Sequence, residues 1–101
     1  MAPDEPIRVI IRLTADREHI EDAARLLDSI VEPSRANPDC LEFRVFRDAG
    51  DPAVFTLYEH WTSFAANRVH AGMDYMAEFV ATSDEIFTSE ATFVHEINAI
   101  A

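Results

Sequence analysis

The sequence predicts a single α+β domain in which an antiparallel sheet carries helices on one face. Four segments, residues 7–14, 40–47, 54–61 and 91–100, alternate in hydrophobicity with a period of two, which is typical of strands. Segments with helical spacing separate the first strand from the second and the third from the fourth. The length of 101 residues fits one domain, so residues 1–101 are expected to form a single unit.

The first strand is expected to bury one face. Its apolar residues at alternate positions are Ile7, Val9, Ile11 and Leu13. Residues 1–6, which are acidic and contain two prolines, are expected to precede it as a disordered or extended leader. Asp16 is expected to cap a long amphipathic helix whose apolar positions continue to Val31. Pro33 is expected to end or kink that helix.

The second and third strands are expected to form a hairpin around a loop of about five residues. In the second strand Leu41, Phe43 and Val45 share a face, and a segment containing Gly50 and Pro52 follows. The third strand divides between two faces. One face carries Phe55, Leu57, Glu59 and Trp61, and the other carries Val54, Thr56, Tyr58 and His60.

A second helical region is expected in two parts. Ser63 is expected to cap a short helix that runs to about His70, with Gly72 at its end. A further helix is expected from about Asp74. Its apolar residues are Met76, Phe79, Val80, Ile86 and Phe87. With the last strand at residues 91–100, the order is the βαββαβ pattern of a ferredoxin-like sheet.

The sheet face opposite the helices is expected to need a cover. It retains apolar residues such as Ile10, Val54 and Tyr58. A second copy of the same sheet is the simplest cover, because isologous dimers are the commonest oligomers. The sequence therefore predicts a homodimer through this face, which makes a dimeric α+β barrel.

Charge and composition exclude several classes of partner. The net charge of −11 repels nucleic acid and anionic membrane surfaces. No apolar run approaches the roughly 20 residues that span a bilayer, and the N-terminus lacks the pattern of a signal peptide. The single cysteine, Cys40, has no disulfide partner within the chain, which favours a cytoplasmic location. The four histidines show no metal-ligand spacing, so no metal is expected.

Three short motifs in fixed order carry a more specific resemblance. Residues 38–40 read Pro-Asp-Cys, residues 58–61 read Tyr-Glu-His-Trp, and Ala66 precedes His70 by four positions. In this order and spacing, and over essentially the whole chain, the sequence resembles the antibiotic-biosynthesis monooxygenase family.

The sequence departs from the family pattern at three positions. Asp39 replaces the usual glycine in the turn, which aspartate tolerates. Phe43 stands where many relatives carry tyrosine. Tyr75 stands where many carry a second histidine.

The resemblance implies oxidation of a small electron-rich aromatic, a phenol or hydroquinone, to a quinone by dioxygen without a cofactor. Deprotonation makes a phenol a better electron donor to dioxygen, so the site needs a base in a dry pocket with aromatic walls. His70 is the expected catalytic proton acceptor, with a pKa near neutrality. The expected substrate-binding residues are Trp61, Glu59, Phe43 and Tyr75. This chemistry requires a largely apolar space between the strand of Trp61 and the helix of His70.

Other interpretations remain open. His70 can be a helix-terminal residue favoured by the helix dipole, Trp61 can be core, and Glu59 can pair with an arginine. The same fold also serves isomerases of a small metabolite or lactone, and non-catalytic dimers that bind a small ligand. A filled pocket with His70 buried against protein groups would be typical of the latter. Haem degradation is disfavoured, because Ile11 stands where haem-degrading relatives carry asparagine.

Overall fold

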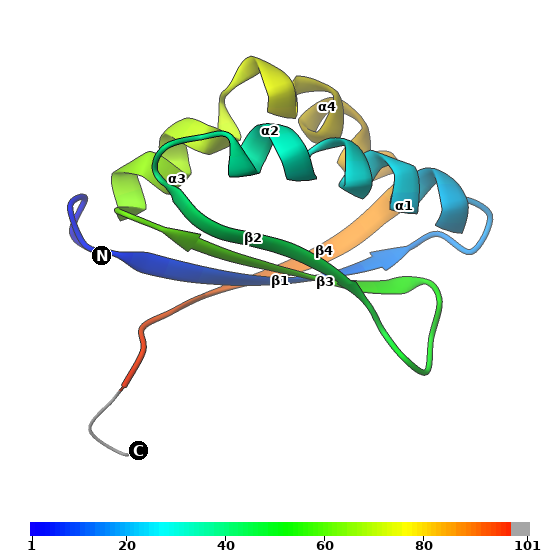
Figure 1. The fold of residues 1–101 in the computed structure, drawn as a ribbon. Coiled ribbons are helices and arrows are strands. Elements are labelled where there is room, and N and C mark those ends of the chain that lie inside the picture. The colour runs from blue at the N-terminus through cyan, green and yellow to red at the C-terminus, as the bar shows by residue number, and fades with distance from the viewer. Residues whose placement is uncertain (98–101) are drawn as a thin grey trace.

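A four-stranded antiparallel sheet forms one layer of the molecule and helices cover one of its faces (Figure 1). The structure is a computed structural model and describes residues 1–97. The strand order is β2-β3-β1-β4. The strands are β1 (Ile7–Ala15), β2 (Cys40–Arg47), β3 (Val54–Trp61) and β4 (Phe87–Val94). The predicted α+β, ferredoxin-like arrangement is confirmed.

The first helical region is broken once and begins later than expected. It consists of α1 (Ile20–Ser29) and α2 (Val31–Arg35). Pro33 explains the break, because it has no N–H to donate to the carbonyl of Ser29. Asp16 is not the helix cap: its side chain accepts from the N–H of Glu18 at 3.1 Å, in a turn that precedes the helix.

The second helical region carries the predicted cap. Helix α3 (Phe64–Ala71) follows Ser63, whose Oγ accepts from the N–H of Ala66 at 3.0 Å. The carbonyls of Pro3 and Glu5 accept the N–H groups of Ala65 and Phe64 at 2.8 and 2.7 Å, so the first residues of the chain also hold this helix end. The 3₁₀ helix η1 (Asp74–Met76) and α4 (Ala77–Ile86) complete the layer.

The start of the last strand was placed too late. Phe87 was expected in the helix, but it begins β4, where it pairs with Ala15 of β1. Its ring also packs edge-on to Phe55 at a centroid distance of 6.5 Å, so burial in the sheet outweighs the helical pattern. Val80, expected on the buried helix face, is exposed. Residues 98–100 of the predicted strand lie outside the described residues.

A bulge in β2 changes the face of one predicted core residue. The register shifts between Cys40, which pairs with Trp61, and Glu42, which pairs with His60. Leu41 lies in this irregularity and is 57% exposed, although alternation had placed it with Phe43. Phe43 itself is 1% exposed, as expected.

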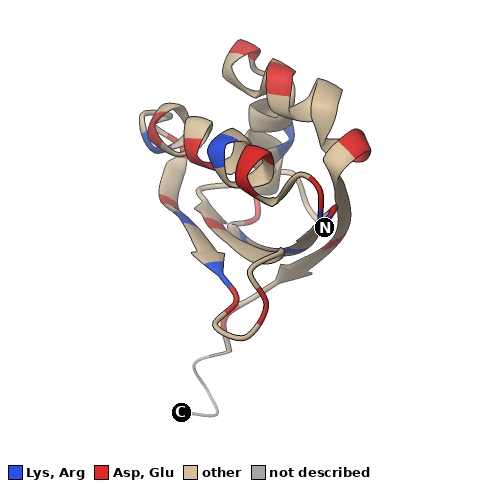
Figure 2. Cartoon of the chain, turned by 90° about the vertical axis from the view of Figure 1, so that its right-hand side faces the viewer, with Lys and Arg blue, Asp and Glu red and all other residues tan. Residues whose placement is uncertain are grey.

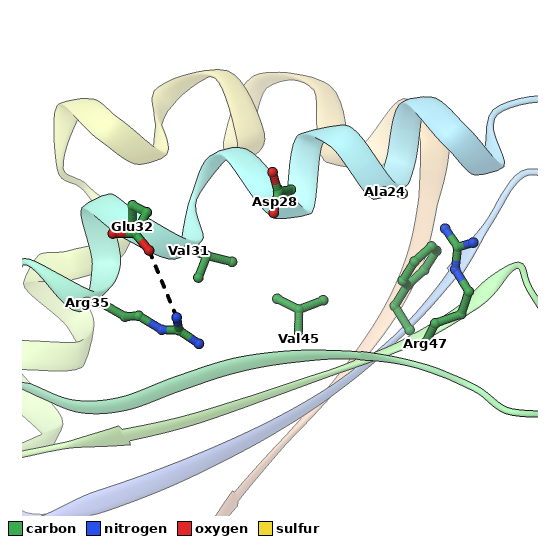
Figure 3. Close-up of a pocket in the computed structure, with 8 residues that line it drawn as sticks. Ala24, Asp28, Val31, Glu32, Arg35, Val45 and Arg47 are labelled. Carbon is green, nitrogen blue, oxygen red and sulfur yellow. Dashed lines mark ion pairs between the residues drawn. The ribbon is translucent and has the colours of Figure 1, made fainter.

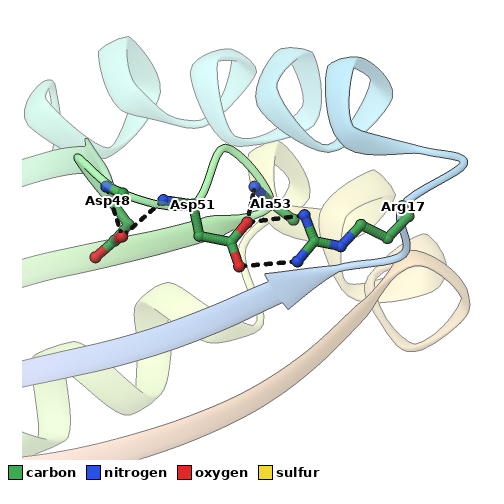
Figure 4. Close-up of polar contacts among 5 residues, drawn as sticks. Arg17, Asp48, Asp51 and Ala53 are labelled. Carbon is green, nitrogen blue, oxygen red and sulfur yellow. Dashed lines mark hydrogen bonds and ion pairs between the residues drawn. The ribbon is translucent and has the colours of Figure 1, made fainter.

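The β2–β3 loop is closed by carboxylates (Figure 4). Asp48 accepts from the N–H groups of Gly50 and Asp51, each at 2.9 Å. Asp51 accepts from the N–H of Ala53 and from both terminal nitrogens of Arg17, the latter at 2.9 Å. The backbone bond and then the guanidinium lower the pKa of Asp51. These contacts fix the end of the hairpin that joins Arg47 to Val54.

The sheet face opposite the helices is amphipathic. Ile10 is 40% and Phe46 is 43% exposed. The Arg8 Nε–H donates to the Tyr58 hydroxyl at 2.8 Å, and the guanidinium of Arg44 lies over the Phe46 ring at 5.0 Å. Val54 was expected to be uncovered, but it is buried beside the loop, whose Asp48 donates its N–H to the Val54 carbonyl.

The helical layer is acidic. Figure 2 shows acidic residues distributed over the helices, with fewer basic ones among them. A polyanion would therefore meet repulsion at this layer. Within residues 1–97 the structure has no helix with the length and apolar character needed to cross a membrane.

Candidate functional site

The five residues predicted from the sequence lie together at one end of the space between sheet and helices. They come from β2 (Phe43), β3 (Glu59 and Trp61), α3 (His70) and η1 (Tyr75). The imidazole of His70 is at the centre. Its ring centroid lies 4.4 Å from Trp61, 5.5 Å from Tyr75 and 5.9 Å from Phe43. We call these five residues the His70 cluster.

Local structure explains how the cluster assembles. Glu59 and Trp61 are two apart in β3 and therefore share the helix-facing side, and Phe43 pairs with Glu59 across the sheet. His70 lies in the last turn of α3, whose start is fixed by the Ser63 cap. A turn at Gly72 then returns the chain, so that Tyr75 in η1 faces His70 again.

A chain of polar contacts runs through the cluster. The Trp61 indole N–H donates to Glu59 Oε1 at 2.8 Å, and His70 Nε2 lies 3.7 Å from the same oxygen. His70 Nδ1 lies 2.5 Å from the Tyr75 hydroxyl. Trp61, Glu59, His70 and Tyr75 are thus linked side chain to side chain by these three contacts.

The direction of these hydrogen bonds follows from a further contact. Asn37 Nδ2 donates to the Tyr75 oxygen at 3.4 Å. The Tyr75 O–H is then free to donate to His70 Nδ1, which leaves the imidazole proton on Nε2, facing Glu59. The cluster thus connects a phenol hydroxyl to a carboxyl through one imidazole.

Burial shifts the pKa values of Glu59 and His70 in opposite directions. Desolvation raises the pKa of Glu59 to about 7, although the Trp61 hydrogen bond opposes the shift. Desolvation lowers the pKa of His70 to about 4. The expectation that His70 titrates near neutrality was therefore wrong, because α3 packs His70 against the sheet with only 3% of its surface exposed. Glu59 is the group that titrates near neutrality.

The empty space expected between Trp61 and His70 is filled by the two rings themselves. Trp61 is 0% and His70 is 3% exposed. A cavity of about 450 Å³ lies beside the cluster instead, lined by Tyr75, Asn37 and largely apolar walls such as Val69 and Met73. Tyr75, which contacts both, lies between the cavity and His70.

A second cavity, of about 490 Å³, lies elsewhere, between α1, α2 and the edge strand β2 (Figure 3). Its two arginines contact other protein groups. Arg47 lies over the Phe55 ring at 4.9 Å, and Arg35 lies 4.0 Å from Glu32. It contains no residue of the His70 cluster, so we assign it no chemistry.

Asn37 is the site residue that sequence reasoning missed. The segment Asn-Pro-Asp at residues 37–39 indicated a turn, and Asn37 Oδ1 does accept from the N–H of Asp39 at 3.0 Å. Its second contact, with Tyr75, joins residues 38 positions apart in the chain. No local pattern could have indicated that contact.

Cys40 borders the cluster without the properties of a nucleophile. It pairs with Trp61 at the start of β2. Burial, and next the nearby Glu59 carboxyl, raise the pKa of its thiol to about 11. The reactive thiolate is therefore disfavoured at neutral pH.

The βαββαβ order, with helices on one face of the sheet, defines an α+β protein of ferredoxin-like topology. Its candidate site consists of a buried imidazole, a buried carboxyl and aromatic rings. Residues 6–82 match the family model described as "Antibiotic biosynthesis monooxygenase". The chain therefore belongs to this family.

A curated relative is sll1783 of Synechocystis, described as uncharacterized. It is 28% identical over 88 residues, which are 87% of this chain and 60% of the relative. The chain thus spans about 60% of the length of the curated protein it matches.

Solved structures share the fold. PA3566 of Pseudomonas aeruginosa has a TM-score of 0.87 at 26% identity, covering 96% of this chain and 97% of that one. Rv0793 of Mycobacterium tuberculosis has a TM-score of 0.87 at 22% identity, covering 96% and 100%. A structure described as an antibiotic biosynthesis monooxygenase has a TM-score of 0.84 at 24% identity, covering 90% and 98%.

Proposed function

We propose that this chain is a monooxygenase that oxidises a small electron-rich aromatic, a phenol or hydroquinone, with dioxygen and without a cofactor. The observation that carries the proposal is the phenol hydroxyl of Tyr75, held 2.5 Å from His70 Nδ1 inside a buried aromatic cluster. The cluster already binds one phenol in the manner that the chemistry requires. Membership of the monooxygenase family supports the reaction class.

In this proposal His70 receives the proton of the substrate hydroxyl on Nδ1. It passes the proton of Nε2 to Glu59 once their 3.7 Å contact shortens to hydrogen-bond length when the substrate binds. The pKa of Glu59, raised to about 7, suits a final proton acceptor near neutral pH. Trp61 and Phe43 supply aromatic walls and exclude water, and Tyr75 forms the wall toward the cavity. His70 is the catalytic residue, Glu59 is the final proton acceptor, and Trp61 and Phe43 bind the substrate ring.

The reaction balances without an external reductant. For a phenol with a free para carbon, one oxygen atom of dioxygen replaces hydrogen at that carbon and the other leaves as water. The substrate loses four electrons, which reduce the two oxygen atoms, and the product is a quinone. A hydroquinone balances in the same way when one oxygen atom enters at a free ring carbon and the other leaves as water, which gives a hydroxyquinone. Proton removal from the hydroxyl comes first, because the phenolate gives an electron to dioxygen more readily.

We also propose that the protein is a cytoplasmic homodimer that pairs through the open sheet face. Exposed Ile10 and Phe46 on that face support the proposal. Light scattering should give twice the mass of the 101-residue chain. A substitution of Ile10 by glutamate should shift the mass toward the monomer, and a monomeric wild type would contradict this part of the proposal.

Oxygen uptake with a panel of phenols and hydroquinones tests the activity. The wild type should consume oxygen with at least one of them, and oxygen from labelled dioxygen should appear in the product. His70→Ala should lose the activity. His95→Ala is the matched control, because His95 is half-exposed and contacts Glu5 instead. Equal rates for the two variants would remove His70 from the reaction.

A non-catalytic ligand-binding dimer is the second candidate, and one observation favours it. The cluster is filled by its own side chains, and His70 contacts protein groups at both ring nitrogens. Saturable quenching of Trp61 fluorescence by phenols, without oxygen uptake or product, would support this candidate. An isomerase would instead show turnover under nitrogen.

A further inference from the structure

We propose that Tyr75 is a built-in stand-in for the substrate, which a phenol must displace to reach His70. This inference rests on the proposed function in one respect, that the substrate carries a phenol hydroxyl. The structure then represents a closed state of the site. Opening consists of moving one side chain out of the cluster and into the neighbouring cavity.

The hydrogen bonds of Tyr75 are those that a substrate would need. Its hydroxyl meets an acceptor, His70 Nδ1 at 2.5 Å, and a donor, Asn37 Nδ2 at 3.4 Å. The other imidazole nitrogen faces Glu59 at 3.7 Å. While Tyr75 is in place, an outside phenol has no position on His70 to occupy. Binding of Tyr75 and of substrate at His70 is therefore mutually exclusive.

The structure also provides room for the displaced ring. Tyr75 lines the cavity of about 450 Å³, which lies within the range of about 300–1,000 Å³ typical of small-molecule sites. The segment that carries Tyr75 is exposed at Gly72, Met73 and Asp74. Its backbone bonds are local, such as Met73 N–H to the His70 carbonyl at 3.1 Å. Rotation of the Tyr75 side chain thus breaks no strand pairing of the sheet.

The lining of the cavity indicates which phenols should enter. Its walls include Pro33, Pro38, Val69 and Met73. Asp39 supplies a carboxylate, and neither arginine nor histidine occurs among the described residues that line it. An anionic phenol, such as a phenol carboxylate, would meet repulsion without a compensating cation. We therefore expect neutral phenols to bind better than phenol carboxylates.

The decisive measurement is phenol binding under nitrogen, where no oxidation occurs. Trp61 is the single tryptophan of the chain and lies 4.4 Å from the His70 ring, so its fluorescence reports on the cluster. Tyr75→Phe keeps the ring and removes the competing hydroxyl. It should bind phenol about fivefold more tightly than the wild type, as expected for the loss of one competing hydrogen bond.

Two controls test whether a change in phenol affinity comes from the hydroxyl of Tyr75. Tyr58→Phe alters the other tyrosine, which bonds to Arg8 on the open sheet face, and should leave phenol affinity unchanged. Anisole, which has no hydroxyl to donate to His70 Nδ1, should bind more weakly than phenol to the wild type and to Tyr75→Phe alike. Weaker or unchanged binding of phenol by Tyr75→Phe would overturn the inference, because Tyr75 would then assist the ligand or be indifferent to it.

A second measurement does not depend on the stability of Tyr75→Phe. In the Tyr58→Phe background Tyr75 is the only tyrosine, so fluorotyrosine labelling gives a single fluorine resonance. Phenol should move this resonance toward the position of an exposed tyrosine. A resonance that stays in place while Trp61 fluorescence reports binding would overturn the displacement.

The two proposals fail separately. If phenols displace Tyr75 but none of them supports oxygen uptake, the displacement of Tyr75 stands and the monooxygenase activity is contradicted. If oxygen is consumed while Tyr75 stays in place, the monooxygenase activity stands and the displacement of Tyr75 is contradicted. Absence of any phenol binding to the wild type and to Tyr75→Phe would overturn the stand-in role.

Discussion

The two halves of strand β3 differ in what they bury on the same face. Phe55 and Leu57 in the first half are each 3% exposed and belong to the apolar core. Glu59 in the second half is also 3% exposed, yet it carries a carboxyl, beside the fully buried Trp61. Equal burial therefore serves apolar packing in one half and a hydrogen-bonded cluster in the other.

The comparison separates what stabilises this protein from what it can use for chemistry. Burying a carboxyl and an imidazole opposes folding unless both are well bonded, whereas apolar side chains in the same positions would not. Buried titratable groups with strongly shifted pKa values are typical of functional sites, although structural networks also contain them. The second half of β3 is thus the part of the core in which substitution should change activity most.

The largest expected effect is on turnover, through Glu59→Gln. If Glu59 is the final proton acceptor, the rate should fall by roughly 10²–10⁴-fold, the usual contribution of general acid–base catalysis. The wild-type rate should rise with pH around the pKa of about 7, and this rise should vanish in the variant. Oxygen uptake measured across pH checks both points. A variant that keeps the wild-type pH profile would exclude Glu59 from proton transfer.

The next effect should be on stability alone, through Leu57→Ala in the first half of the strand. Leu57 is buried in the apolar cluster, so truncation should lower the free energy of unfolding by about 2–5 kcal/mol. Urea denaturation measures this loss. Oxygen uptake per folded molecule should match the wild type, and a large loss there would show that the two halves are not separable.

A further effect concerns stability against pH. The folded state holds the proton of Glu59 up to a pKa of about 7, against 4.5 ordinarily, so this group lowers the free energy of unfolding as pH rises between the two values. His70, with its pKa lowered from 6.5 to about 4, acts oppositely: its contribution to stability is lost as pH falls through that range. The pH ranges of the two groups overlap between 4.5 and 6.5. In that overlap the opposite effects of Glu59 and His70 on the free energy of unfolding should largely cancel in the wild type.

Glu59→Gln removes the contribution of Glu59 and leaves that of His70, so the two can be measured separately. At about 1.4 kcal/mol per pKa unit, the stability of the variant relative to the wild type should rise by roughly 3 kcal/mol between pH about 4.5 and about 7. Urea denaturation at several pH values measures the difference. Glu90→Gln, on an exposed position of β4, is the control and should show no such trend. A flat difference for Glu59→Gln would mean that Glu59 is ionised in the folded protein.

The smallest expected effect concerns the helix that carries His70. Ser63→Ala removes the cap of α3 and should cost about 1 kcal/mol of stability. Ser89→Ala, on exposed β4, provides a serine control that should stay near the wild-type value. A Ser63→Ala variant of wild-type stability, measured in urea, would show that the contacts from Pro3 and Glu5 suffice to hold the helix end.

Several elements could be predicted because their patterns are local. The alternation in β1 and β3 assigned each side chain to the correct face, and Ser63 indicated its own helix start. Leu41 was misplaced because a bulge depends on how two strands pair. Phe87 was misplaced because its pairing with Ala15 is non-local, as is the contact of Asn37 with Tyr75.

The sequence by itself determined the βαββαβ order and, through period and spacing, the shared face of Glu59 and Trp61 and the helix of His70 that crosses it. Phe43 and Tyr75 were expected at the site from the family resemblance. Only the tertiary structure decided that the space between indole and imidazole is closed and that Glu59, rather than His70, titrates near neutrality. Both depend on how deeply α3 and η1 pack against the sheet. That depth sets the exclusion of water, which no local pattern of residues encodes.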